Sequence, residues 1–281
     1  MGTTLFLTQR NKILEAYTQA GQPFQASTKP YKSTVTFSYQ NVEVIAAATI
    51  AWMVAKSGQA YEWFGYKISD PVPGNSGVPA YRHGNEADTN ISKARTTNGA
   101  EDFVIEAMSA SCRGIRVKSS AFEVASVEAS NCLVGNYPIY DPGSLYIAPQ
   151  IMSPFNLQNG LYRNMAPYIS IEFEWDRSRI TKVGTLEQLP EGGANSYLNS
   201  SGEPSTNDRY RIPEGYIWRR EGEPDSEFIV RGTLQDSIAC PMLQVSTPGV
   251  GTTPLVVNAT SVNLDVVLRL HGLSVKLPTR N

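Results

Sequence analysis

The chain has 281 residues, of which 41% are hydrophobic, and its 24 basic and 26 acidic side chains give a net charge of −2. This length can bury the core of one large or two small domains, and the hydrophobic content excludes a disordered chain. The nearly balanced charge gives no bulk attraction to nucleic acid, so no specific nucleic-acid partner is predicted.

The few cysteines and histidines argue against cross-links by disulfides or metal ions. Cys112, Cys132 and Cys240 are odd in number and widely spaced, which predicts free, buried thiols rather than a disulfide framework. Two histidines are too few to favour a Cys/His zinc site. No metal or other cofactor is therefore expected.

The N-terminus has no basic segment followed by a long apolar run. The longest apolar stretch, residues 45–55, is too short to cross a bilayer as a helix. We therefore expect a chain made in the cytoplasm, without a secretion signal or a membrane-spanning helix.

In chain order, the first predicted element is a helix in residues 8–20. Ile13, Leu14 and Tyr17 form a narrow apolar stripe, and Gly21 can end the helix. Because the stripe is thin, we expect the helix to dock on something larger, either its own body or a neighbouring subunit.

Residues 21–33 contain two prolines and are predicted to be a linker or arm. The chain is therefore divided into an N-terminal arm with a short helix, residues 1–33, and a β body, residues 34–281.

The β body contains many short apolar, β-branched and aromatic runs separated by polar segments. Strands are predicted in residues 34–39, 42–55 as two segments, 61–68, 103–117, 122–134, 168–176, 210–220, 228–234, 242–245, 255–257 and 262–277. Long polar loops are predicted in residues 70–101, 136–167 and 190–208. This order, without alternating helices, favours an antiparallel sandwich over a βαβ fold.

The last predicted strand, residues 262–277, has the clearest period of two. The apolar parity changes between Leu270 and Leu273, on either side of Gly272, which is typical of a β-bulge that re-aims the following side chains. The opposite parity is polar, including Asn263 and Asp265, so one face of the strand is expected to be buried.

Acidic side chains alternate with apolar ones in residues 168–176. Glu172, Glu174 and Asp176 share one face, and a carboxylate pair of this kind can serve glycoside hydrolysis. The polar side of a half-buried strand explains the same pattern better, with Arg or Lys from a neighbouring strand or subunit offsetting the charge.

Other candidate sites are weak. His83 lies in a Gly/Pro loop and His271 beside the expected bulge, and no Gly-x-Ser-x-Gly motif accompanies either histidine. Residues 86–90 resemble a fragment of a calcium loop but lack its glycine and its distal glutamate. We therefore predict no catalytic, cofactor-binding or metal-binding residue, and no enzyme activity.

Basic and aromatic residues interleave in one segment: Arg209, Tyr210, Arg211, Tyr216, Trp218, Arg219 and Arg220. Such a cluster can clamp single-stranded nucleic acid or sugars. Nearby acidic residues almost cancel its charge, however, which favours an exposed strand pair with cross-strand ion pairs.

The layout resembles that of jelly-roll coat proteins of tailless icosahedral bacteriophages. The resemblance rests on the arm and the long loops, on three short stretches, residues 88–91 leading into 101–107, and residues 227–232, and on the terminal strand through residues 268–273. It implies an antiparallel jelly-roll sandwich, either a compact double roll or a single roll with long insertions. The family has no catalytic residues to carry over.

The resemblance implies a self-associating coat subunit in a virion, a trimer within a larger shell that contacts other virion proteins and, through its arm, an internal membrane. A chain with long exposed loops and an arm also suits repeated self-association. The alternative is a carbohydrate- or receptor-binding sandwich of a phage fibre or spike. Its site would use aromatic residues: Trp63, Tyr66, Tyr216 or Trp218.

Overall fold

The structure is a computed structural model of the whole chain. It describes residues 9–21, 23–28, 30–39, 41–44, 51–74, 83–99, 101–119, 123–124, 133–135, 149–151, 162, 165–177, 179–189, 210–241, 244–245, 255–256 and 259–276. The predicted loops at 136–167 and 190–208 lie largely or wholly outside these residues, as does Cys132.

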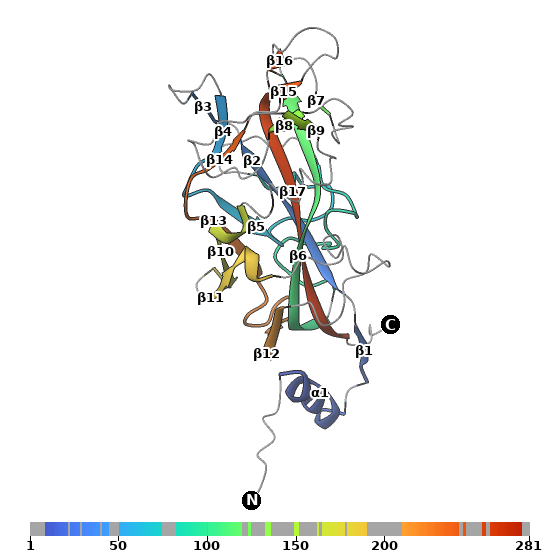
Figure 1. The fold of residues 1–281 in the computed structure, drawn as a ribbon. Helices are drawn as coiled ribbons and strands as arrows, with labels where there is room; N and C mark the ends of the chain where they lie inside the picture. The colour runs from blue at the N-terminus through green and yellow to red at the C-terminus, as the bar shows by residue number, and fades with distance from the viewer. Residues whose placement is uncertain are drawn as a thin grey trace, which may run out of the picture.

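The described chain is mostly β-structure, with one α-helix and two short 3-10 helices (Figure 1). The elements are α1 (Gln9–Gln19), β1 (Gln25–Thr28), β2 (Tyr31–Tyr39), β3 (Asn41–Val44), β4 (Ala51–Ala55), β5 (Ala60–Trp63), β6 (Glu101–Ser119), β7 (Glu123–Val124), β8 (Leu133–Gly135), β9 (Pro149–Ile151), η1 (Ala166–Tyr168), β10 (Ile169–Trp175), β11 (Arg179–Thr185), η2 (Leu186–Gln188), β12 (Tyr210–Trp218), β13 (Phe228–Leu234), β14 (Ile238–Pro241), β15 (Gln244–Val245), β16 (Leu255–Val256) and β17 (Ala259–Lys276). The predicted helix, the two segments in 42–55 and the long terminal strand are confirmed.

The largest sheet is built on β17 and β6, which pair along 18 and 19 residues and run through most of the length of the molecule (Figure 1). One edge of β17 pairs with β2 and, further along, with β1. The far edge of β6 pairs with β12 and β7. The linker expected at 21–33 thus contributes β1 and the start of β2 to this sheet, so the boundary at residue 33 falls inside β2.

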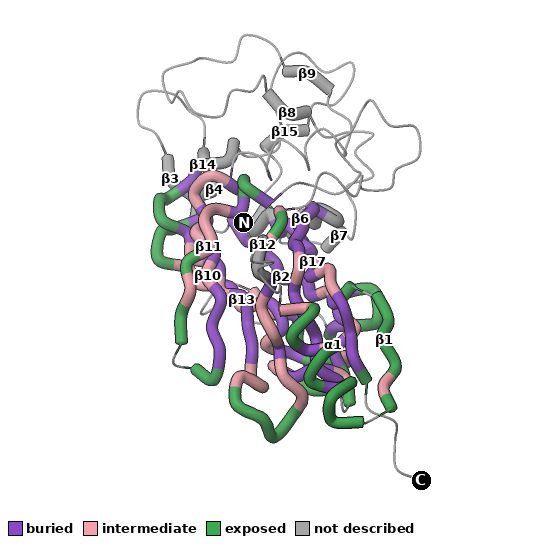
Figure 2. The backbone as a smooth tube through the Cα atoms, turned by 90° about the horizontal axis from the view of Figure 1, so that it is seen from below, coloured by how far each residue is buried: buried purple, intermediate pink, exposed green. Residues whose placement is uncertain are grey.

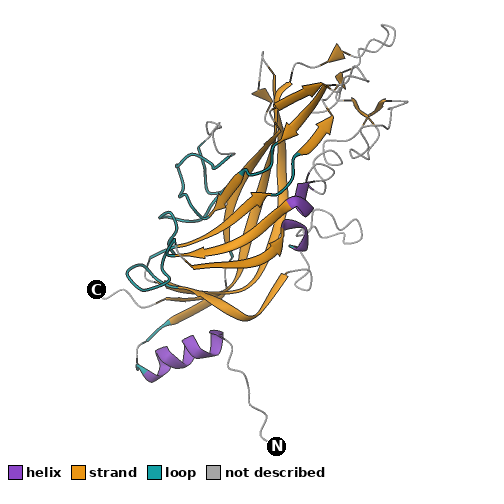
Figure 3. Ribbon diagram, turned by 90° about the vertical axis from the view of Figure 1, so that its left-hand side faces the viewer, coloured by secondary structure: helices purple, strands orange, loops and turns teal. Residues whose placement is uncertain are grey.

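A second sheet, in the order β11-β10-β13-β5, packs against the first, and every strand pair in both sheets is antiparallel. Figure 2 shows β11, β10 and β13 of the second sheet beside β2, β17 and β6 of the first, and Figure 3 shows α1 below the strands. The core between them is rich in aromatic side chains that are almost fully buried, including Phe37, Trp63, Phe173, Trp218 and Phe228. Because large aromatic rings bury the most apolar area per residue, this cluster holds the two layers together. The antiparallel sandwich is therefore confirmed.

The bulge expected in the last strand lies in its neighbour instead. The pairs His271↔Ala107 and Gly272↔Ile105 leave Glu106 as the extra residue, on β6. Accordingly, the side chains that face the core switch parity in β6, from Ile105 to Met108. The prediction that the bulge re-aims β17 is wrong.

In β17 the apolar parity changes because its other face becomes buried. Leu270 belongs to the main core, whereas Leu273 and Val275 belong to a second cluster with Ile13 and Tyr17 of α1. Gly272 is required for a different reason: a Cβ there would lie 1.7 Å from the carbonyl oxygen of Val104 on β6.

The outer face of the first sheet is also buried, contrary to the expectation of one solvent-facing side. Asn263 and Asp265 of β17 are 4% and 3% exposed. Asp265 accepts a hydrogen bond from Thr36 Oγ1 at 2.8 Å, and Ser38 Oγ donates to Asn263 Oδ1 at 2.5 Å. Polar side chains pair across β2 and β17, which allows a polar face to be buried at low cost.

Candidate interaction site at the N-terminal helix

Helix α1 lies against the lower end of the large sheet (Figure 3). Ile13 and Tyr17 are its buried residues, at 3% and 7% exposure, and they pack on Val104 and Val275 among others. The remaining helix surface is half-buried or exposed, as Figure 2 shows from below. The thin apolar stripe therefore docks on the chain's own body, which is one of the two alternatives that the sequence left open.

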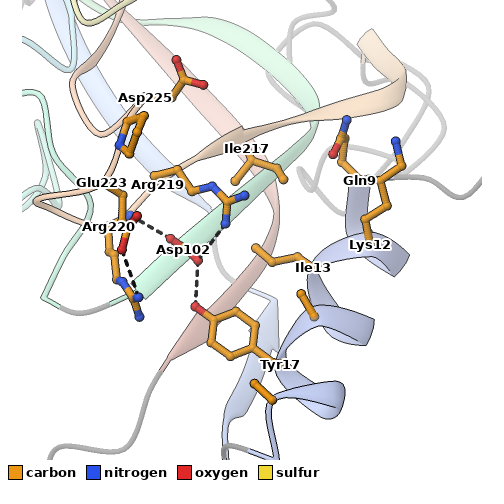
Figure 4. A pocket seen from close by; sticks show the side chains of 13 residues that line it. Gln9, Lys12, Ile13, Tyr17, Asp102, Ile217, Arg219, Arg220, Glu223 and Asp225 are labelled. Atoms are coloured by element: carbon orange, nitrogen blue, oxygen red, sulfur yellow. Dashed lines mark hydrogen bonds and ion pairs between the residues drawn. The ribbon is translucent and has the colours of Figure 1, made fainter.

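A buried carboxylate lies under the helix. Asp102, near the start of β6, is 2% exposed. Its Oδ2 accepts hydrogen bonds from Tyr17 Oη at 2.7 Å and Arg219 Nη1 at 3.3 Å, and its Oδ1 accepts one from the backbone N–H of Arg220 at 2.8 Å (Figure 4). One side chain thus joins α1, β6 and the end of β12.

Burial and the neighbouring carboxylate both disfavour the phenolate form of Tyr17. Desolvation is the larger cause, and the hydrogen bond to Asp102 adds to it, so that the pKa of Tyr17 rises to about 12. The hydroxyl therefore remains a hydrogen-bond donor to Asp102 over the whole physiological pH range.

A cavity of about 550 Å³ runs between α1 and the segment that follows β12 (Figure 4). It is lined by Gln9, Lys12, Ile13, Ala16, Tyr17, Ala20, Asp102, Ile217, Arg219, Arg220, Glu223, Pro224 and Asp225. Its carboxylates all have arginine partners: Asp102 with Arg219, Glu223 with Arg220 at 3.2 Å, and Asp225 with Arg179 at 3.2 Å. The lining of the cavity therefore combines paired charges with apolar side chains such as Ile13 and Ile217.

The two histidines take part in separate local contacts. His83 is exposed, and its Nδ1 lies 2.9 Å from the carbonyl oxygen of Ser69, beside an isolated bridge to Pro71. His271 Nε2 lies 2.9 Å from Ser109 Oγ on the neighbouring strand β6. The two lie on different elements and are not brought together.

One carboxylate of the acidic face predicted in residues 168–176 forms an ion pair across the second sheet. Glu174, 6% exposed, lies 2.8 Å from Arg231 of β13, and the same guanidinium lies 3.4 Å from Glu62 of β5. Asp176 accepts the backbone N–H groups of Asp225 and Glu227. The expectation that an arginine of a neighbouring strand offsets the acidic face is confirmed for Glu174.

The aromatic residues named for a sugar-binding site lie mostly in the interior. Trp63 and Trp218 are fully buried, and their indole N–H groups donate to the carbonyl oxygens of Val266 and Ser226. Tyr66 is 4% exposed, and the ring of Tyr216 packs against Phe173 edge to face and against Trp175 at a tilt. The expectation that Trp63 and Trp218 could present their faces to a ligand is wrong, because both side chains are buried in the core between the sheets.

The fragment that resembles a calcium loop is a turn closed by its own side chain. Asp88 is fully buried, and its Oδ2 accepts the backbone N–H of Asn85 at 3.0 Å. Across the described part of the chain, no three His, Cys, Asp or Glu side chains are grouped so that they could hold a metal ion. Of the basic cluster around β12, Arg219 pairs with Asp102 of the neighbouring strand β6, as predicted, whereas Arg220 pairs with Glu223 of its own segment.

Sequence reasoning missed Asp102, which the structure makes the centre of the helix contact. An aspartate at the beginning of an apolar strand produces no periodic pattern that marks it as buried. Its only hint is that it follows Glu101, so that two acidic residues begin a long apolar run.

No helix among the residues that the structure describes is long and apolar enough to span a membrane. No protein-family model, curated protein or solved structure matches the chain.

Proposed function

We propose that the chain is a structural protein that assembles with copies of itself, a jelly-roll coat subunit of a bacteriophage that forms trimers within a shell. The observation that carries this proposal is the pairing of β6 with β17 along most of the length of the molecule, with both faces largely buried over residues 101–112 and 263–275. Two long paired strands of this kind form a stiff sheet. A shell needs subunits that keep their shape while their edges contact neighbouring subunits.

The N-terminal segment supports the same proposal. Helix α1 is held at one end of the large sheet by its two buried side chains and by hydrogen bonds from Tyr17 to Asp102 and from Arg10 to Glu106. Most of its surface remains available to a neighbouring subunit, to another virion protein or to an internal membrane. A virion location for the finished protein follows from the proposal.

The direct test removes residues 1–20. The shortened chain should keep its β body, measured by near-UV circular dichroism of the buried Trp63 and Trp218, but should lose particles in negative-stain images. Equal particle yields from the full and the shortened chain would contradict the role of the arm. A body that unfolds without residues 1–20 would show that α1 serves stability, and would remove the helix as an argument for assembly.

A further inference from the structure

On the side of β17 away from β6, the large sheet is continued by two strands. β2 pairs with residues 262–270 of β17, and β1 pairs with residues 273–276. These two strands differ in how their outer backbone groups are satisfied. A strand edge with free N–H and C=O groups is a template for another strand, and proteins usually block such edges.

The outer edge of β2 is blocked residue by residue. The N–H of Lys32 donates to Asn90 Oδ1 at 2.8 Å, and its C=O accepts the N–H of Asn90 at 3.4 Å. Both backbone groups of Thr34 bond to Tyr66 Oη. The N–H of Thr36 donates to the carbonyl oxygen of Pro73 at 2.9 Å.

These contacts also define which backbone N–H and C=O groups of β1 point away from β17. The backbone groups of residues 32, 34 and 36 point away from β17. The residues between them, such as Ser33 and Val35, therefore form the hydrogen-bonded pairs with β17, and their partners there have even numbers. Along β17 the even-numbered residues Ser274 and Lys276 lie opposite Ser27 and Gln25 of β1. Ser27 and Gln25 therefore use their backbone groups to bond to β17. The outward N–H and C=O groups of β1 are therefore those of Ala26 and Thr28.

No partner for these groups is found among the residues that the structure describes. All four side chains of β1 are exposed, and the strand forms the outer margin of the molecule in Figure 2. Its sequence, Gln-Ala-Ser-Thr, has no charge, no proline and no bulge. By contrast, β11, an edge of the second sheet, carries Arg179, Lys182 and a register shift, which are the usual protections.

We propose that β1 is an assembly edge, at which β1 of a second copy adds antiparallel across a two-fold axis centred on Ser27. Ala26 then lies opposite Thr28 of the other copy, and about four backbone hydrogen bonds form between the two strands. The occupant is a second copy because a Gln-Ala-Ser-Thr strand opposite itself brings no like charges together. The resulting sheet is continuous across both molecules.

This inference deepens the proposed function, since it names one contact between subunits. The proposed pairing fixes two distances between the copies. Ser27 would face its own copy in a non-hydrogen-bonded pair, with Cα atoms about 4.5 Å apart. The two Gln25 residues would be offset by about 14 Å along the strands. Only the first distance permits a disulfide.

The experiment compares Ser27→Cys with Gln25→Cys in the full chain under mild oxidation, read on a non-reducing gel. Ser27→Cys should form a disulfide-linked dimer at least about tenfold faster than Gln25→Cys and the unchanged chain, because only its geometry fits the bond. Adding Thr28→Pro, which removes an outward N–H but no bond to β17, should reduce this dimer.

Equal rates for the two cysteine variants would overturn the inference, as would the absence of any dimer. A Ser27→Cys chain that assembles into particles without the cross-link would contradict β1 as the contact and leave the proposed function standing. A chain that remains a monomer in all forms would contradict both.

Discussion

The contact between Tyr17 and Asp102 leads to a prediction that can be worked out in detail. Tyr17→Phe keeps the ring in its apolar cluster with Val104, Leu273 and Val275 and removes only the hydroxyl group. The lost bond, 2.7 Å long, is made to a buried carboxylate. A hydrogen bond to a charged group contributes about 1.5–3 kcal/mol, so helix detachment should become roughly 10- to 150-fold more frequent.

Hydrogen exchange measured residue by residue is the assay, because α1 can detach while the body stays folded. The amides of α1 should exchange faster by that factor in Tyr17→Phe, and those of β6 and β17 should not change. Tyr216→Phe is the matched control, since no hydrogen bond of the Tyr216 hydroxyl is found in the described structure.

Unchanged exchange in α1 would refute the view that Asp102 holds the helix. The same acceleration in α1 and in the strands would also refute it, because it would mean that the helix opens only when the whole molecule unfolds.

The raised pKa of Tyr17 adds a pH dependence to the same contact. Because the pKa rises from 10 in the unfolded chain to about 12, the contribution of Tyr17 is fully present below pH 10 and is lost as the pH rises through about 12. The protection of α1 in the unchanged chain should fall over this range more than in Tyr17→Phe. Parallel pH profiles would contradict this attribution.

Two further substitutions test the sheet structure by urea unfolding. Gly272→Ala should cost about 3–5 kcal/mol, because its Cβ would lie 1.7 Å from a backbone oxygen of β6, whereas Gly74→Ala, with 3.8 Å to its nearest neighbour, should change stability by less than about 1 kcal/mol. Equal costs would contradict the close approach at β6. Arg231→Met should cost about 3–5 kcal/mol, because it leaves the buried Glu174 unpaired. Arg177→Met breaks an exposed pair and should cost less than about 1 kcal/mol; a similar loss for both would show that burial does not matter here.

The sequence predicted most elements correctly where a single period dominates. Strand β10, with Ile169, Ile171 and Phe173 on one side, and helix α1, with Ile13 and Tyr17, match their expected bounds closely. These patterns are local, so nearby residues are enough to identify them.

The sequence did not reveal which faces are covered. Asn263 and Asp265 resemble the solvent side of a strand, yet they are buried, and their partners Ser38 and Thr36 are more than 200 residues away in sequence. Polar pairing across strands satisfies such side chains without leaving any periodic trace.

The same reason explains the errors at Gly272 and at the two tryptophans. A parity change in one strand can come from a bulge or from a second packing partner, and only the position of α1 distinguishes the two. Trp63 and Trp218 resemble ligand-binding residues in sequence, but the space between the sheets requires large side chains, and these rings fill it.

The central claim, that this chain is a subunit of a larger assembly, is tested most directly by its mass in solution. Light scattering on the full chain over a range of concentrations should give multiples of 30.8 kDa, with trimers and larger particles at higher concentration. A mass of 30.8 kDa at every concentration would contradict the claim.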